Sequence, residues 1–201
     1  MAQHRLVFPE TYVSPDGAEF SVRPARPDDR EAFRAFFEKL PPRDRLHFQE
    51  DLTAPGALDR WANAVEAGRA TILLALHDDR IVAQVGVLRR PYGWTRHVGY
   101  MQTIVLPEYR GRGIATKLVR RSIELAVQLG LDKVVAEVLT DQRRERKILE
   151  AHGFKKEAIL QDHATDHEGR KRNVIVLSNQ VYELWRRMED LIIDKEFEVI
   201  P

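Results

Sequence analysis

The stretch Val105-Leu106-Pro107-Glu108-Tyr109-Arg110-Gly111-Arg112-Gly113-Ile114-Ala115 connects an apolar run typical of a β-strand to a periodic run typical of a helix. Gly111 and Gly113 give the backbone access to positive φ angles and let a ligand approach closely. The first N–H groups of the following helix have no partner inside it and carry partial positive charge. With Arg110 and Arg112 beside them, these amides predict a site for a phosphate or pyrophosphate group.

The spacing of this loop does not fit the two common nucleotide-binding loops. One residue separates Gly111 from Gly113, whereas the nucleoside-triphosphate loop needs four residues between its glycines, and Lys117 comes too late for that motif. The dinucleotide fingerprint needs Gly or Ala where Thr116 stands. A nucleoside-triphosphate binder is therefore a weak alternative.

The whole stretch resembles the acyl-CoA pyrophosphate loop of the GNAT family of N-acyltransferases. Its Arg110-x-x-Gly113-x-Ala115 segment matches the family core Arg/Gln-x-x-Gly-x-Gly/Ala. Segments 22–29 and 43–48 are similar, more loosely, to bacterial GNAT domains related to protein-lysine acetyltransferases. The resemblance implies an N-acetyltransferase that moves an acetyl group from acetyl-CoA to a primary amine by direct attack, without a metal. That amine is a small molecule, a protein lysine or a protein N-terminus.

Composition limits the other classes of function. The chain has 201 residues and a net charge of +1, which predicts one domain over 1–201 and no basic field for nucleic acid or an anionic membrane. The absence of cysteine excludes disulfides, a thiol nucleophile and thiolate metal sites. Residues 1–5 do not start the long apolar core typical of a signal peptide, and no apolar run approaches the length of a membrane helix, so we expect neither. We therefore expect a cytoplasmic protein.

The pattern along the chain predicts a mixed α/β fold with a central mixed sheet and helices on both faces. The expected strands cover 11–13, 18–23, 71–77, 81–88, 97–106, 133–139, 154–162 and 172–177, and the expected helices 28–40, 43–51, 57–67, 116–129 and 141–151. This order resembles the GNAT core over residues 18–178. The N-terminal hairpin strand and a helix over 179–195 are expected additions. The apolar stripe of that helix favours packing on the core, and a homodimer is the alternative.

The resemblance assigns acetyl-CoA contacts by position. Backbone groups of the strand before the loop would bind the pantetheine arm, and loop amides would bind the pyrophosphate. Arg110 and Arg112 are candidates for phosphate contacts, and Gln142 replaces the Asn that commonly contacts pantetheine. The expected cofactor-binding residues are Thr103, Ile104, Val105, Arg110, Gly111, Arg112, Gly113, Ile114, Ala115, Thr116 and Gln142.

The catalytic groups of the family are only partly matched. Gly99 stands where many members carry a Glu base, and Leu149 stands where a Tyr commonly protonates the leaving thiolate. Ala136-Glu137-Val138 is similar to the Leu-Glu-Val of ribosomal-protein alanine N-acetyltransferases, whose Glu is a base. Burial of Glu137 in its apolar strand would raise its pKa and suit it to that role, and the alternative is a carboxylate at an exposed strand edge. His97 is a second candidate base.

The acceptor is expected opposite the cofactor, beside segments 33–40, 43–51 and 162–168. The acidic and histidine residues of the last segment are either an attraction for a cationic amine or an exposed hairpin tip, and they lack regular metal-ligand spacing. The missing Glu and Tyr leave a rival from another class, a non-catalytic module that binds acyl-CoA.

Overall fold

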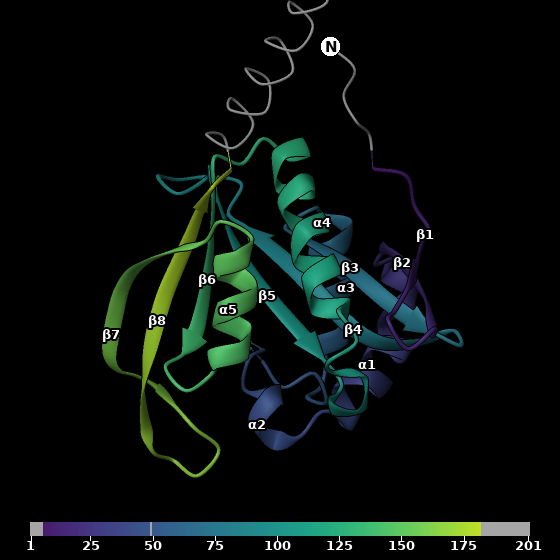
Figure 1. The fold of residues 1–201 in the computed structure, drawn as a ribbon, viewed down its shortest axis with the longest axis horizontal. Coiled ribbons are helices and arrows are strands. Elements are labelled where there is room, and N and C mark those ends of the chain that lie inside the picture. Colours follow the sequence, from purple (N-terminus) through teal and green to yellow (C-terminus); the bar gives the residue numbers. More distant parts are fainter. Residues whose placement is uncertain (1–5, 49, 182–201) are drawn as a thin grey trace, which may run out of the picture.

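A computed structural model describes residues 6–48 and 50–181 of the chain. These residues build an eight-stranded sheet in the order β1-β2-β3-β4-β5-β6-β8-β7 (Figure 1). The strands are β1 Glu10–Val13, β2 Glu19–Pro24, β3 Ala70–His77, β4 Arg80–Arg89, β5 Val98–Val105, β6 Lys133–Leu139, β7 Lys155–Thr165 and β8 Lys171–Gln180.

Helices lie on both faces of this sheet, so the predicted mixed α/β fold is confirmed. In Figure 1, α4 and α5 cover the near face, and α1 and α3 lie behind it. The helices are α1 Arg30–Lys39, α2 Pro42–Arg45, α3 Ala57–Glu66, α4 Ile114–Gln128 and α5 Arg143–Ala151, with short 3-10 turns η1 Pro27–Asp29 and η2 Pro107–Tyr109. Within the described ranges, no helix is long and apolar enough to cross a membrane.

One pair of neighbouring strands is parallel, and it opens partway along. β5 and β6 run parallel until Met101 lies opposite Ala136, and the pairing ends there. β4 stays paired with β5 as far as Val105, and β8 stays paired with β6 as far as Leu139. The two strands therefore part before the glycine loop, and the unpaired edges face each other across an opening.

The apolar face of α1 belongs to the core. Phe33, Phe36 and Phe37 are at most 2% exposed, and the Phe33 ring stacks on Trp61 with centroids 4.5 Å apart. Within the segment 33–40, predicted to lie beside the acceptor, these phenylalanines are unavailable to a ligand because they fill the space between α1, α3 and the sheet, whereas Arg34 and Glu38 are exposed.

The helix expected over residues 43–51 is much shorter than predicted. α2 ends at Arg45, after one turn. In a longer helix the His47 carbonyl would accept from the amide of Asp51, but here it accepts from the side-chain amide of Gln102 on β5. The chain therefore leaves the helical path to reach the opening between β5 and β6.

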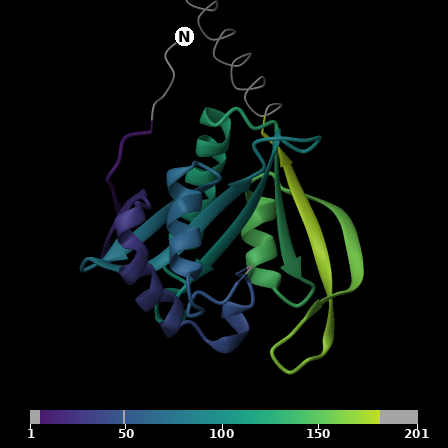
Figure 2. The ribbon, with the colours of Figure 1, turned by 180° about the vertical axis from the view of Figure 1, so that it is seen from behind.

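The two faces of the sheet are covered unequally. Seen from behind, α1 and α3 cover the β2–β4 half, whereas none of the described helices stands in front of β6, β8 and β7 (Figure 2). The side chains on this side of β6, which are Lys133, Val135, Glu137 and Leu139, are half-buried or exposed and fit such an open face. The C-terminal helix predicted over 179–195 lies almost entirely outside the described residues.

Candidate active site

Along β5, the hydrogen-bonding groups of the backbone point alternately toward β4 and toward β6. The Leu106 amide, just beyond the strand, donates to the Val82 carbonyl on β4 at 2.9 Å. The His97 carbonyl, just before the strand, accepts from the Lys133 amide on β6 at 3.3 Å. Since backbone groups alternate along a strand, odd-numbered residues of β5 point theirs toward β6 and even-numbered residues toward β4.

Three residues of β5 were expected to offer backbone groups to pantetheine. Thr103 and Val105 point theirs into the opening, because β6 has already left. The backbone groups of Ile104 face β4 instead, where Ile104 lies opposite Gln84, so the structure gives no support to that contact. The Thr103 hydroxyl is buried and has no hydrogen-bond partner among the described residues, and its side chain leaves β5 on the same face as that of Met101, which packs on α4.

The glycine loop adopts the backbone that its sequence predicts. Gly111 and Gly113 have φ angles of +82° and +79°. Gly113 is the N-cap of α4, and no side chain caps the helix there. The amides of the first turn of α4, which starts at Ile114, are thus left without side-chain acceptors, as an anion site at a helix N-terminus requires.

The two arginines of the loop are already paired within the chain. Arg110 forms an ion pair with Asp44 of α2, and its Nε donates to the Val105 carbonyl at 3.0 Å. Arg112 Nε lies 3.4 Å from Asp16, and its guanidinium lies 5.4 Å from the Tyr109 ring centre. Arg110 therefore ties the loop to β5 and α2, whereas Arg112 is held by an exposed carboxylate that a phosphate would have to displace.

Glu137 lies on β6, one position beyond the last pair with β5. Paired residues of parallel strands point to the same face, so Glu137 shares its face with Gln102 and not with Met101, which packs on α4. The expectation of a buried Glu137 is wrong, because its side chain is exposed on the face that lacks a helix. This position gives the carboxylate direct access from solvent.

His47 occupies the opening between β5 and β6. Its Nε2 lies 3.0 Å from the side-chain nitrogen of Gln142, and its carbonyl accepts from Gln102. The Gln142 side-chain oxygen accepts from the Leu139 amide at 2.7 Å. It thereby takes the place of the β5 carbonyl that this amide would bond if the two strands stayed paired. Burial lowers the pKa of His47, so the ring is neutral near pH 7. Gln142, predicted to contact pantetheine, thus holds β6 and His47.

Other predicted catalytic positions lie elsewhere. His97 is exposed in the turn before β5, at the opposite end of that strand from the glycine loop. Gly99 points into the core, where a Cβ would lie 2.8 Å from both Leu131 and Val87, so no Glu fits there. Leu149 is 6% exposed in α5 and has no proton to donate. Among these positions only Glu137, described above, adjoins the opening.

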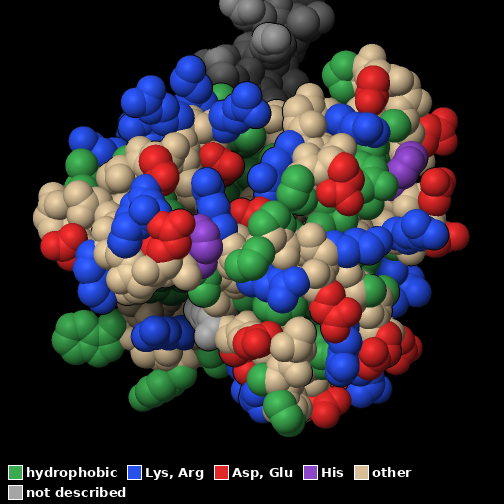
Figure 3. Space-filling view, turned by 90° about the horizontal axis from the view of Figure 1, so that it is seen from below, with side chains coloured by type: hydrophobic (Ala, Val, Ile, Leu, Met, Phe, Trp, Pro, Cys, Tyr) green, Lys and Arg blue, Asp and Glu red, His purple; other side chains and the backbone are tan. Residues whose placement is uncertain are grey.

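The acidic hairpin tip is internally neutralised. Asp166 pairs with Arg170 at 3.0 Å and with Arg172 at 3.2 Å, and it caps the turn by accepting from the Glu168 amide. Over residues 6–48 and 50–181, no three His, Cys, Asp or Glu side chains gather to hold a metal. Figure 3 shows Lys and Arg side chains intermingled with Asp and Glu on the face seen from below.

Several residues of this site were not identified from the sequence. His47 and Gln102 meet at the opening, and Asp44 and Tyr12 reach the glycine loop from α2 and β1. Tyr12 and Arg112 are 100 positions apart in the chain, and Asp44 and Arg110 are 66 apart. No local pattern marks such pairs, although 43–48 was already noted for its family resemblance.

Comparisons with known proteins agree with this geometry. The model of the acetyltransferase (GNAT) family matches residues 29–154, well over half of the chain. N-alpha-acetyltransferase 30 of Schizosaccharomyces pombe is 29% identical over 107 residues, which cover 53% of this chain and 71% of that protein. Acetyltransferase PA5475 of Pseudomonas aeruginosa is 27% identical over 144 residues, covering 69% and 76%.

The fold is also that of solved acetyltransferases. The structure of yncA, a putative acetyltransferase from Salmonella typhimurium with its cofactor acetyl-CoA, superposes with a TM-score of 0.65 at 17% identity, over 81% of this chain and 94% of that one. With the family match over strands, loop and α4, these findings show that the chain belongs to the GNAT family and is an acyl-CoA-dependent acetyltransferase with acetyl-CoA as its cosubstrate.

Proposed function

We propose that this enzyme acetylates a primary amine by direct attack on acetyl-CoA, with Glu137 as the group that accepts the amine proton. The observation that carries the proposal is the place of Glu137: exposed, on the uncovered face, one position past the point where β5 leaves β6. A base must lie within reach of the proton it removes, and this carboxylate adjoins the opening from the side that is free for an acceptor.

The opening and the loop divide the binding of acetyl-CoA between them. Thr103 and Val105 point backbone groups into the opening, and apart from the Val105 carbonyl, which accepts from Arg110, these groups suit the amides of an extended pantetheine arm. The amides from Gly111 to Thr116 form the anion site at the start of α4 and suit the pyrophosphate.

Acetyl-CoA supplies an acetyl thioester to this site. The amine nitrogen forms a bond to the thioester carbon, the carbon–sulfur bond breaks, and the Glu137 carboxylate takes the proton from the amine. The departing sulfur leaves as the CoA thiolate. Because Leu149 cannot protonate it, we propose that water does so at the opening between β5 and β6.

Release of free CoA thiol from acetyl-CoA in the presence of amines tests this proposal. The panel contains polyamines, amino sugars, lysine peptides and peptides with free α-amino groups, the last suggested by the name of the Schizosaccharomyces pombe relative. Glu137→Gln is expected to lower kcat about 100- to 10,000-fold with little change in the KM for acetyl-CoA. The matched control is Glu66→Gln, since Glu66 is exposed at the end of α3.

Two results would contradict the proposal. If Glu137→Gln keeps wild-type kcat, the base lies elsewhere. If the wild-type protein binds CoA but no amine in the panel releases thiol, a primary amine is not the acceptor.

A further inference from the structure

The strand β1 lies outside the part of the chain that matches the family, yet it contacts the cofactor loop. The family match starts at residue 29, and β1 covers Glu10–Val13 at the edge of the sheet. Glu10 and Tyr12 are two positions apart, so their side chains leave the strand on the same side. Both reach across to the segment formed by the glycine loop and α4.

Tyr12 holds one peptide unit of the loop. Its hydroxyl donates to the Arg112 carbonyl at 2.8 Å. Since the peptide is planar and trans, fixing this carbonyl directs the Gly113 N–H to the opposite side, away from Tyr12. The approach leaves no space for a side chain, because a Cβ on Gly113 would lie 2.3 Å from the Tyr12 hydroxyl. The orientation of the Gly113 amide, at the N-cap of α4, is therefore set by β1.

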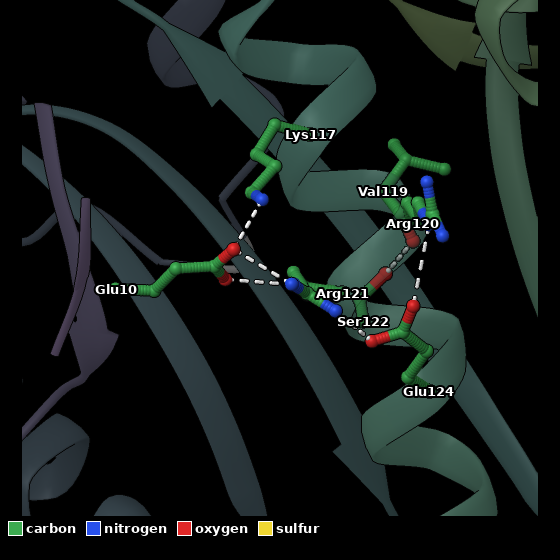
Figure 4. A network of polar contacts seen from close by, with 7 residues as sticks. All are labelled: Glu10, Lys117, Val119, Arg120, Arg121, Ser122 and Glu124. Atoms are coloured by element: carbon green, nitrogen blue, oxygen red, sulfur yellow. Dashed lines mark hydrogen bonds and ion pairs between the residues drawn. The ribbon is translucent and has the colours of Figure 1, made fainter. Parts of the chain in front are cut away.

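Glu10 anchors the same strand to the body of α4. Its carboxylate accepts from Arg121 at 2.6 and 2.7 Å and also pairs with Lys117, one helical turn earlier (Figure 4). Arg121 in turn pairs with Glu124. These contacts lower the pKa of Glu10 to about 2, the hydrogen bond from Arg121 contributing most. The strand is thus fixed to α4 through Glu10 and to the loop through Tyr12.

We propose that Tyr12 is a positioning residue for acetyl-CoA, which acts by holding the Gly113 amide toward the pyrophosphate without contacting the cosubstrate itself. This inference rests on the assignment of Gly111–Thr116 as the pyrophosphate site under the proposed function. It adds to that assignment a contribution from β1, which lies outside the matched family region. Loss of the Tyr12 hydroxyl must therefore weaken the binding of ligands that carry a pyrophosphate and leave the binding of ligands without it unchanged.

The test compares CoA with pantetheine, which has the same arm but no pyrophosphate. Dissociation constants are measured by ¹H–¹⁵N NMR titration of wild type and Tyr12→Phe, a change that removes one hydroxyl. We expect the Kd for CoA to rise about two- to tenfold, the range for one hydrogen bond, and the Kd for pantetheine to stay unchanged. Tyr92→Phe is the matched control, because Tyr92 is 91% exposed.

The outcomes separate this inference from the proposed function. An equal loss of affinity for both ligands in Tyr12→Phe overturns the inference, because it indicates a general structural effect. Unchanged affinity for CoA overturns it as well and leaves the proposed function standing. A wild-type protein that does not bind CoA overturns the proposed function and, with it, the role of Tyr12.

Discussion

Replacing Glu10 by Gln removes the charge that joins β1 to α4 while keeping the size of the side chain. The pKa of Glu10 falls from its ordinary value of 4.5 to about 2, chiefly through the hydrogen bond from Arg121. At 1.36 kcal/mol for each pH unit, this corresponds to an upper limit of about 3.4 kcal/mol. The carboxylate side chain is 23% exposed, so solvent screens part of the interaction. We therefore expect Glu10→Gln to lower the free energy of unfolding by about 1–2 kcal/mol at pH 7.

The pH dependence of this loss has a definite sign. Because folding lowers the pKa of Glu10, its stabilisation is complete above about pH 4.5 and is lost as the pH falls toward 2. The difference in unfolding free energy between wild type and Glu10→Gln must therefore shrink over this range. Urea unfolding followed by far-UV circular dichroism at pH 7, 4.5 and 3 measures it. The reasoning is refuted if the difference is absent at pH 7 or equally large at pH 3. Glu66→Gln, at an exposed position, should match wild type throughout.

Two further substitutions test the packing of the site. Gly99→Ala should lower the free energy of unfolding by about 1–3 kcal/mol, because its Cβ would meet Leu131 and Val87 at 2.8 Å; wild-type stability in urea would show that this contact relaxes freely. His47→Asn should make stability less dependent on pH, because burial lowers the pKa of His47 and the wild-type chain therefore loses stability as the pH falls below its ordinary value of 6.5. Melting temperatures measured between pH 7 and 5 check this. A melting temperature that falls equally with pH in wild type and His47→Asn would contradict it.

The order of strands and helices follows directly from local patterns. The resemblance of the whole stretch 105–115 to the GNAT loop identifies the cofactor loop, and the apolar periodicity on either side places it between a strand and a helix. The predicted strand over 133–139 coincides with β6. These features were predictable because neighbouring residues determine them.

The side chains that complete the site depend on tertiary contacts and escaped prediction. The position of Arg110 in the loop motif predicts a phosphate contact, yet its charge is paired with that of Asp44 on α2. Glu137 stands in an apolar run that suggests burial, but its side chain leaves β6 on the face that none of the described helices covers. Tyr12 looks like an ordinary strand residue, and only the folded chain brings it to Arg112. Long-range pairing of this kind leaves no periodic signal in one sequence.

A crystal structure of the enzyme with CoA tests the central claim most directly. The account predicts the pyrophosphate on the amides of residues 111–116, the pantetheine arm along Thr103 and Val105, and the sulfur on the side of the opening next to Glu137. A sulfur that lies remote from Glu137, or a pyrophosphate bound away from the glycine loop, would contradict it.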